Sequence, residues 1–266
     1  MTSTRASQAA SSILLQEERA PGVSMLTLNR PNQYNALSEE MLAALQSTAD
    51  SIATRDDVKV LILAANGKAF CAGHDLKEMR TKPERHYYEE LFARCSRMML
   101  TLTRMPQIVI ARVQGMATAA GCQLVANADL AVASEEVRFA VSGVNLGLFC
   151  STPSVPLSRN VSRKRAFEML ATGEFISAPT AVEYGLINQA VPPEKLEQTV
   201  DQLALNIAAK PADTLRAGKA LFYRQLNLPL AEAYQVAGDT MACNMLFPDT
   251  LEGIDAFIEK RKPDWN

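Results

Sequence analysis

Residues 68–79 read KAFCAGHDLKEM and follow an apolar strand that we expect over residues 58–65. A second stretch, IVIARVQGMATAAGCQ at residues 108–123, again leads from an expected strand through small residues into a helix that begins near Ala120. Small side chains let a ligand approach the free N–H groups of such turns and helix ends. Tight strand–helix packing explains either stretch alone equally well. The two stretches together predict two N–H groups directed at one oxygen, as in a site that stabilises an oxyanion or enolate.

The rest of the chain predicts an α/β body followed by a helical tail. A hairpin is expected around Pro21-Gly22, a helix capped by Ser38 over residues 38–54, and a helix over residues 84–104. Further strands are expected at residues 107–113, 128–133 and 137–140. From residue 162 the pattern is almost wholly helical, with helices expected at 162–171, 178–184, 195–209, 211–225, 230–246 and 249–260.

These patterns divide the chain into a flexible N-terminus at residues 1–12, a core at 13–195 and a C-terminal helical region at 196–266. The apolar faces of the last region are expected to be only partly covered in a monomer, which favours oligomerisation. They include Leu196, Val200, Leu203 and Ile207.

Composition excludes several classes of protein. The chain has 266 residues, is 48% hydrophobic and carries a formal charge of −2, so we expect one large core and no nucleic-acid or membrane partner. Its five cysteines form no C-x-x-C pair, which predicts neither disulfides nor a metal site and favours a reducing, cytoplasmic location. Residues 1–12 lack a secretory signal, although Arg5 without acidic neighbours is weakly compatible with mitochondrial targeting.

The two stretches resemble the corresponding motifs of the crotonase (enoyl-CoA hydratase/isomerase) superfamily. LNRP at residues 28–31, NAL at 35–37 and EKRKP at 259–263 extend the resemblance over nearly the whole chain. The resemblance implies a spiral of ββα turns and a homotrimer, or dimer of trimers, assembled through the C-terminal helices. It also implies an acyl-CoA thioester as ligand, with no cofactor beyond the CoA moiety of that substrate.

The same resemblance assigns roles to individual residues. It implies that the backbone N–H groups of His74 and Ala120 form the oxyanion hole. It further implies that the adenine and pantetheine path is lined by Ala72, Asp75, Leu76 and Lys77. The nucleotide end would be covered from the tail by Phe257 and Lys260. The lysines can meet CoA phosphates as point charges, with a solvated side chain as the alternative for Lys77. For Asp75 we prefer a role in fixing the loop.

The chain departs from the family at the two glutamates that hold the attacking water in hydratases. These positions are Gln123 and Gly143 here. A glutamine amide can hold a water but exchanges no proton near pH 7, and glycine has no side chain. Each general acid–base group contributes roughly 10²- to 10⁴-fold to rate, so we expect standard hydration to be lost.

The pocket wall also differs, because GLFCSTPS at residues 147–154 replaces the usual family turn Pro-Gly-x-Gly-Gly. This makes Cys150 and Ser151 candidate reactive groups, with a simply buried thiol as the alternative for Cys150. A cysteine nucleophile needs a lowered pKa and a nearby base, and the only histidines are His74 and His86, the latter expected at the surface. Together with GHDLKE at 73–78, this segment is similar to a subgroup called enoyl-CoA hydratase domain-containing protein three.

Two functions of different classes follow. The first is an enzyme that stabilises an acyl-CoA enolate or oxyanion, for example in decarboxylation of a malonyl-type thioester, which needs no protein base. The second is a catalytically inactive or weak acyl-CoA-binding or scaffold protein that keeps the fold and the cleft.

Overall fold

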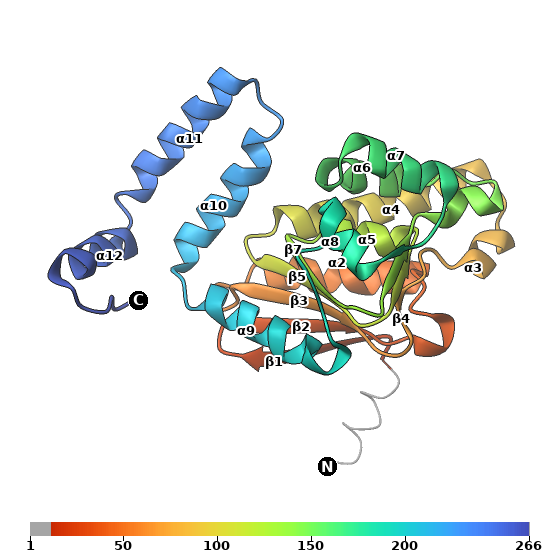
Figure 1. Ribbon diagram of the computed structural model, residues 1–266, viewed down its shortest axis with the longest axis horizontal. Helices are drawn as coiled ribbons and strands as arrows, with labels where there is room; N and C mark the ends of the chain where they lie inside the picture. The colour runs from red at the N-terminus through yellow and green to blue at the C-terminus, as the bar shows by residue number, and fades with distance from the viewer. Residues whose placement is uncertain (1–11, 266) are drawn as a thin grey trace, which may run out of the picture.

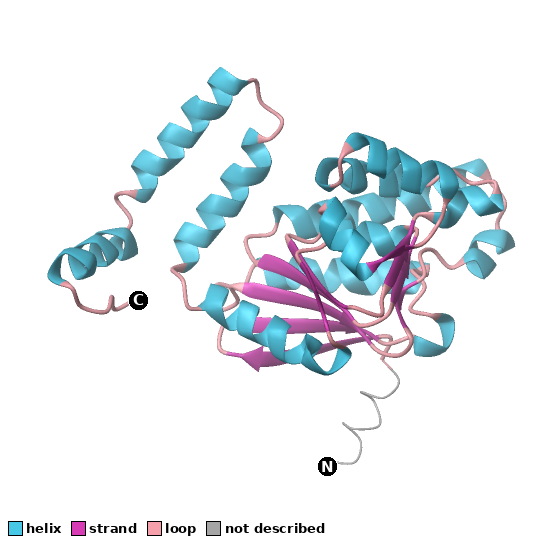
Figure 2. Ribbon diagram, in the orientation of Figure 1, coloured by secondary structure: helices cyan, strands magenta, loops and turns pink. Residues whose placement is uncertain are grey.

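The computed structural model describes residues 12–265, in which two β-sheets form the body of the protein (Figures 1 and 2). The larger sheet has the order β1 (Leu14–Ala20), β2 (Val23–Leu28), β3 (Val60–Ala65), β5 (Ile108–Val113), β7 (Leu130–Ser134) and β10 (Gln189–Val191). The smaller has the order β4 (Ala69–Cys71), β6 (Met116–Thr118), β8 (Arg138–Ala140) and β9 (Ile176–Ser177). Only the β1–β2 and β8–β9 pairs are antiparallel among these strands. The flexible N-terminus expected at residues 1–12 lies outside the described residues apart from Ser12.

The middle of the chain winds as a spiral, because each of the pairs β3–β4, β5–β6 and β7–β8 gives its first strand to the larger sheet and its second to the smaller one. Strands β3 and β4 lead to α3 (Leu76–Thr81) and α4 (Arg85–Arg104), and β5 and β6 lead to α5 (Ala120–Asn127). Strands β7 and β8 lead through η2 (Ser142–Leu146) to α6 (Ser151–Asn160) and α7 (Arg163–Thr172). All six residues of β3 are buried, as in a parallel strand covered on both faces. The expected α/β spiral of ββα turns is confirmed.

Helix α2 (Glu39–Ala53) shows how closely local signals define an element. The Ser38 side chain accepts a hydrogen bond of 3.2 Å from the backbone N–H of Met41, which satisfies one free donor of the first turn. The apolar face that the sequence predicts is buried, and the helix packs against α4. Its buried residues are Met41, Leu42, Leu45, Ala49 and Ile52.

From residue 162 the chain is almost wholly helical, as expected, and the structure adds two details that the sequence pattern did not predict. Helix α6 already begins at Ser151, and the short strands β9 and β10 interrupt the helical part on either side of α8 (Ala178–Tyr184). Strand β10 pairs with β7 and completes the larger sheet. The short helix η3 (Pro193–Lys195) follows it in the chain. Strands of two and three residues are too short to produce an alternating pattern, so no local pattern predicts them.

Helix α9 (Leu196–Ala208) packs on the larger sheet rather than standing with the helices that follow it. Leu196 and Val200 are buried in one cluster with Val60 and Ile62 of β3. The expectation that a monomer leaves this face partly uncovered is therefore wrong for Leu196 and Val200, while Leu203 and Ile207 are partly buried against the same cluster.

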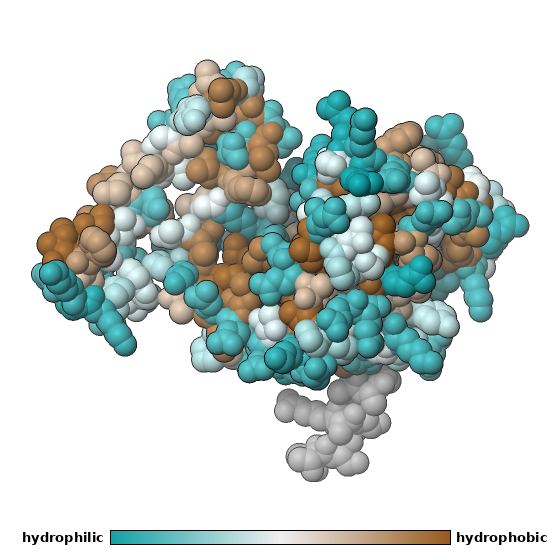
Figure 3. Space-filling view, in the orientation of Figure 1, coloured by the Kyte–Doolittle hydropathy of each residue, from teal (hydrophilic) through white to brown (hydrophobic). Residues whose placement is uncertain are grey.

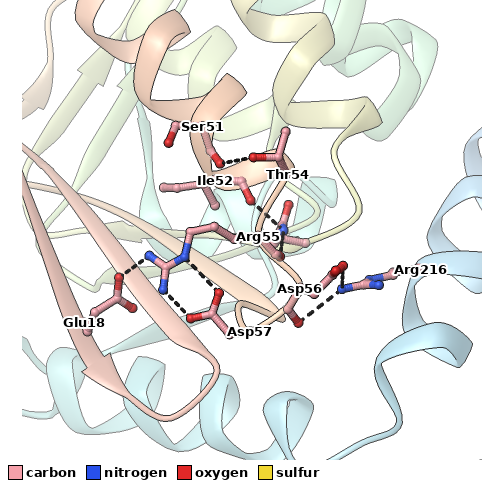
Figure 4. Close-up of polar contacts among 9 residues, drawn as sticks. Glu18, Ser51, Ile52, Thr54, Arg55, Asp56, Asp57 and Arg216 are labelled. Atoms are coloured by element: carbon pink, nitrogen blue, oxygen red, sulfur yellow. Dashed lines mark hydrogen bonds and ion pairs between the residues drawn. The ribbon is translucent and has the colours of Figure 1, made fainter.

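The last three helices form an arm, α10 (Ala212–Gln225), α11 (Leu230–Asn244) and α12 (Pro248–Glu259), and Figure 1 shows α11 and α12 standing away from the body. Arg216 of α10 pairs with Asp56 on the loop after α2, at 2.9 Å (Figure 4). On the same loop Arg55 binds Asp57 and Glu18, which ties the loop to β1. The first helix of the arm is thus fixed to the body at an ordered loop.

A second, buried contact anchors α10. The ammonium group of Lys219 donates hydrogen bonds to the carbonyls of Leu102 (3.0 Å) and Gln107 (2.7 Å) and to Asp129 (2.7 Å). The hydroxyl of Tyr223 donates to the other oxygen of Asp129 at 2.6 Å. Burial lowers the pKa of Lys219 and the nearby Asp129 opposes this, while burial raises the pKa of Tyr223. The charges are therefore paired inside the protein, where an unpaired charge is costly.

Candidate functional site

The two turns singled out in the sequence lie in direct contact. A Cβ added to Gly73 would lie 3.0 Å from the Cβ of Ala119 and 3.2 Å from the backbone nitrogen of Ala120. A Cβ on Gly121 would lie 1.9 Å from the carbonyl oxygen of Cys71, so only glycine allows this approach. The hydroxyl of Thr118 also donates to the carbonyl of Ala72, at 3.1 Å. The loop after β4 and the first turn of α5 are therefore fixed side by side.

Each of the two turns leaves a backbone N–H group free. Ala120 is the first residue of α5, where the N–H group has no carbonyl partner within the helix. The preceding Ala119 has φ 49° and ψ −120°, a conformation that residues with a side chain rarely adopt, and its own N–H donates to the carbonyl of Ala140 at 3.0 Å. Among residues 12–265 no acceptor is found for the N–H of His74. Both N–H groups therefore lack an acceptor among the described residues.

Asn35 holds the His74 loop in place, a role that sequence reasoning missed. The side chain is fully buried; its oxygen accepts the N–H of Arg30, and its nitrogen donates to the carbonyls of Asn66 and Ala69, each at 2.8 Å. Leu37 then pairs with the loop, donating its N–H to the carbonyl of Gly73 at 2.8 Å. The sequence signal was present in NAL at residues 35–37, but it served only as a mark of the family.

The carboxylate of Asp75 caps α3. It accepts the N–H groups of Lys77 (3.2 Å) and Glu78 (3.3 Å), and Arg30 lies 3.4 Å from its other oxygen. These contacts support a structural role for Asp75 in fixing the loop rather than a contact with ligand. Beside it, Leu76 and Lys77 are exposed, and Ala72 is half-buried.

Phe257 and Lys260 do not join these residues within one chain. Phe257 lies in α12 and is 85% exposed, and Lys260 ends that helix in a left-handed conformation with φ 57°. Figure 1 places α12 at the opposite side of the molecule from α3 and β4. Contact of this segment with the His74 loop therefore needs another copy of the chain or a large movement of the arm.

The two positions at which the family has glutamates differ in the space around them. Gln123 is buried, and its side-chain oxygen has no hydrogen-bond partner among the described residues. Gly143 has no room for any side chain, because a Cβ there would lie 2.3 Å from the carbonyl oxygen of Leu148 and 2.7 Å from the sulfur of Cys150. The loop after η2 thus occupies the space that a side chain at position 143 needs.

The surroundings of Cys150 and Ser151 do not favour a reactive thiol or hydroxyl group. The Cys150 sulfur accepts the N–H of Gly143 at 3.3 Å, and burial raises the pKa of this thiol while that hydrogen bond opposes the rise. A thiol with a raised pKa is a poor nucleophile at neutral pH. Ser151 is exposed and donates its hydroxyl hydrogen to the carbonyl of Phe149 at 3.3 Å.

The ring of His74 is enclosed by the protein. It lies edge-on to Phe92 of α4, with ring centroids 5.4 Å apart, and the backbone of Leu37 is a polar neighbour of the ring. Burial lowers the pKa of His74, and the backbone of Leu37 partly opposes this, so the ring is neutral at pH 7. His86 is exposed beside Glu90, as expected.

Other candidate sites are weaker within the described part of the chain. No group of three or more His, Cys, Asp or Glu side chains in residues 12–265 is placed to hold a metal ion. None of the helices there is long and apolar enough to cross a membrane. A surface hollow of about 1090 Å³ runs along α9. Its lining includes Glu194, Glu197 and Asp201, which would repel the phosphates of a nucleotide.

The spiral fold and the paired turns define a protein of the crotonase type. The sequence matches the Enoyl-CoA hydratase/isomerase family over residues 18–266, and the chain belongs to this family. It is similar to the rat protein named "Enoyl-CoA hydratase domain-containing protein 3, mitochondrial", with 46% identity over 253 residues, 95% of this chain and 84% of the relative.

Solved structures agree with this assignment. An enoyl-CoA hydratase from Mycobacterium smegmatis is 58% identical with a TM-score of 0.95, covering 96% of this chain and 99% of that one. Human enoyl-CoA hydratase domain-containing protein 3 is 44% identical with a TM-score of 0.93, covering 96% of this chain and 100% of that one. The chain is therefore a crotonase-family protein that resembles the domain-containing protein 3 subgroup.

Proposed function

We propose that this protein binds an acyl-CoA thioester and holds its carbonyl oxygen between the backbone N–H groups of His74 and Ala120. The observation that carries the proposal is the contact between Gly73 and Ala120, which places two turns with free N–H groups beside one another. Pre-aimed donors of this kind stabilise a developing negative charge by roughly 3 to 4 kcal/mol each in other enzymes.

The CoA part of the ligand is proposed to follow the outer face of this loop. Lys77 is exposed there, and its ammonium group has no hydrogen bond or ion pair with a described residue, so it is free to meet a phosphate. Ala72 and Leu76 line the same path. Lys260 and Phe257 are proposed to reach the nucleotide end from the arm of a neighbouring copy. No cofactor is proposed beyond the CoA moiety of the substrate.

The proposed chemistry forms an enolate or oxyanion without a protein base. In decarboxylation of a malonyl-type thioester, the bond to the carboxylate breaks and CO₂ leaves. The electron pair passes to the thioester oxygen between the two N–H groups, and solvent then protonates the carbon. Gln123 and Gly143 supply no acid or base, which disfavours hydration and double-bond migration. The same two residues support the alternative, an acyl-CoA-binding or scaffold protein with little or no activity.

A ligand panel tests binding and turnover together. Acetyl-CoA, butyryl-CoA and malonyl-CoA are expected to raise the melting temperature, since a ligand at 100 times its Kd adds about 2.7 kcal/mol of stability. Lys77→Met is expected to weaken binding about tenfold, and Lys164→Met, on the exposed face of α7, serves as the matched control. Release of CO₂ from malonyl-CoA supports the enzyme. Binding without conversion of any thioester supports the binding protein, and no binding at all rejects both.

We further propose that the arm assembles the protein into a trimer or a dimer of trimers. No residue of α11 is buried within the chain. Tyr234 (74% exposed), Leu246 (77%) and Phe257 (85%) present large side chains to solvent. Figure 3 shows patches of hydrophobic residues on the surface of the arm. Monomers rarely expose apolar surface on this scale.

Light scattering on the purified protein tests the assembly. The expected mass is three or six times 29.0 kDa, and Tyr234→Glu with Leu246→Glu is expected to lower it. The matched control is Phe167→Glu, which replaces an exposed aromatic residue of α7 outside the arm. A monomeric wild-type protein would rule out this proposal.

The location of the protein is a separate proposal. The five cysteines without a C-x-x-C pair favour a reducing, cytoplasmic location, whereas the rat and human relatives are named mitochondrial. Fractionation of the native cells decides between the two compartments.

A further inference from the structure

Another surface hollow, of about 290 Å³, lies between the C-terminal ends of α2 and α4, and no residue of the paired turns lines it. Its lining consists of Ala53, Arg97, Leu100, Thr101, Arg104 and Met105. There is no aspartate or glutamate among these described residues, whereas acidic side chains line the hollow along α9. The lining of this hollow therefore carries positive charge only.

The two arginines of the hollow lack the partners that the other arginines of α4 have. Arg85 and Arg94 form ion pairs with glutamates at 2.7 and 2.8 Å. Arg97 and Arg104 have neither a hydrogen bond nor an ion pair with a described residue. They are seven positions apart and so lie on the same face of the helix. Both guanidinium groups are therefore free to reach one ligand in the hollow.

The rest of the lining supplies a further donor and an apolar floor. The Thr101 oxygen accepts a hydrogen bond from the Gln46 amide at 2.9 Å, and the hydroxyl hydrogen has no acceptor among the described residues. Leu100, 47% exposed, and the buried Met105 supply hydrocarbon surface. Asp50, one turn before the end of α2, accepts the same Gln46 amide at 2.9 Å and does not line the hollow. Each polar side chain of the lining can thus donate a hydrogen bond.

We infer that this hollow binds an amphiphilic anion, a carboxylate or phosphate group joined to a short apolar chain. The two guanidinium groups and the Thr101 hydroxyl hold the anionic group, because arginine donors match the geometry of carboxylate and phosphate oxygens. The chain lies on Leu100 and Met105. The volume is at the lower end of the roughly 300 to 1,000 Å³ usual for small-molecule sites, which suits a short chain. This inference does not rest on the proposed acyl-CoA function.

Calorimetric titration with matched probes tests the inference. Octanoate and octyl phosphate carry both the charge and the chain, 1-octanol carries only the chain, and inorganic phosphate carries only the charge. Octanoate and octyl phosphate are each expected to bind at least about tenfold more tightly than 1-octanol or inorganic phosphate. The ratio of their own affinities shows whether the site prefers a carboxylate or a phosphate. Their binding is expected to weaken as the salt concentration rises.

Variants of the lining test which side chains hold the probe. Arg97→Met and Arg104→Met remove the charge and keep a long side chain that favours a helix. Each is expected to weaken binding of octanoate and octyl phosphate about tenfold, the size of one hydrogen bond to a charged group. Arg163→Met, at an exposed arginine of α7 without an ion pair to a described residue, is the matched control and is expected to keep the affinity. Leu100→Gln is expected to weaken binding of the two octyl anions but not of inorganic phosphate.

Methyl nuclear magnetic resonance locates the bound probe. The methyl signal of Met105, identified by its loss in Met105→Leu, is expected to shift with octanoate. An excess of acetyl-CoA is expected to leave that shift in place, because the paired turns lie outside the hollow. Octyl anions that bind no more tightly than 1-octanol or inorganic phosphate, affinity that survives both arginine variants, or displacement by acetyl-CoA would overturn the inference. None of these outcomes decides whether a thioester binds at His74 and Ala120.

Discussion

Crotonyl-CoA is expected to be hydrated by this protein at well below the 1 to 10³ per second that is usual for enzymes. Gln123 exchanges no proton near neutral pH, and Gly143 has no side chain. Each missing acid–base group removes roughly 10²- to 10⁴-fold of rate, even where the thioester is held correctly. The measurement is loss of the enoyl absorbance with purified protein. Hydration at an ordinary enzymatic rate would contradict the interpretation that Gln123 and Gly143 cannot support this reaction.

Restoring both glutamates is not expected to restore hydration. Gln123→Glu alone fits a position that already holds a side chain of the same length. Gly143→Glu is different, because its Cβ would lie 2.3 Å from the carbonyl of Leu148, a backbone atom that moves only with its loop. The double variant is therefore expected to stay inactive on crotonyl-CoA and to melt at a lower temperature than Gln123→Glu. A double variant with full stability and strong hydration would show that position 143 is open.

Lys219→Met is expected to destabilise the protein by about 3 to 5 kcal/mol, because it removes one partner of a buried ion pair. Three acceptors lose their donor at once, the carbonyls of Leu102 and Gln107 and the carboxylate of Asp129. Since Lys219 anchors α10, the arm is expected to become more accessible to protease. Denaturant unfolding followed by circular dichroism measures the free energy, and limited proteolysis measures the arm.

A double-mutant cycle separates the ion pair from other effects of that change. Asp129→Asn combined with Lys219→Met leaves no unpaired charge and is expected to cost less than the sum of the two single changes. Lys164→Met, at an exposed lysine, is expected to change the free energy of unfolding by less than about 0.5 kcal/mol. Additive effects of the two single changes would contradict the buried pair.

Long, strongly patterned elements were predictable from the sequence. Helix α2 has its cap at Ser38 and its buried face at the expected positions, and β3 reads as a strand because all six of its residues are apolar. The sequence also predicted that the two turns lie close to each other, because both follow strands and consist of small residues. These features are local, or repeat at a fixed period, and the sequence records them directly.

Features that depend on distant parts of the chain were not predictable. Strands β9 and β10 are too short to carry a pattern, and α9 looks like any amphipathic helix until the sheet that covers Leu196 is known. Position 143 has no space for a side chain because the loop that follows it folds back and brings Cys150, seven residues later, against Gly143. The enclosed ring of His74 depends on Phe92, which belongs to the next long helix. Each of these depends on tertiary packing rather than on local propensity.

The central claim is that a thioester oxygen binds between the N–H groups of His74 and Ala120. A crystal structure of the protein with butyryl-CoA tests this most directly. We predict the thioester oxygen at about 2.7 to 3.1 Å from both backbone nitrogens, the distance required of oxyanion-hole donors. A bound acyl-CoA with its thioester oxygen out of hydrogen-bond reach of either nitrogen would contradict the account.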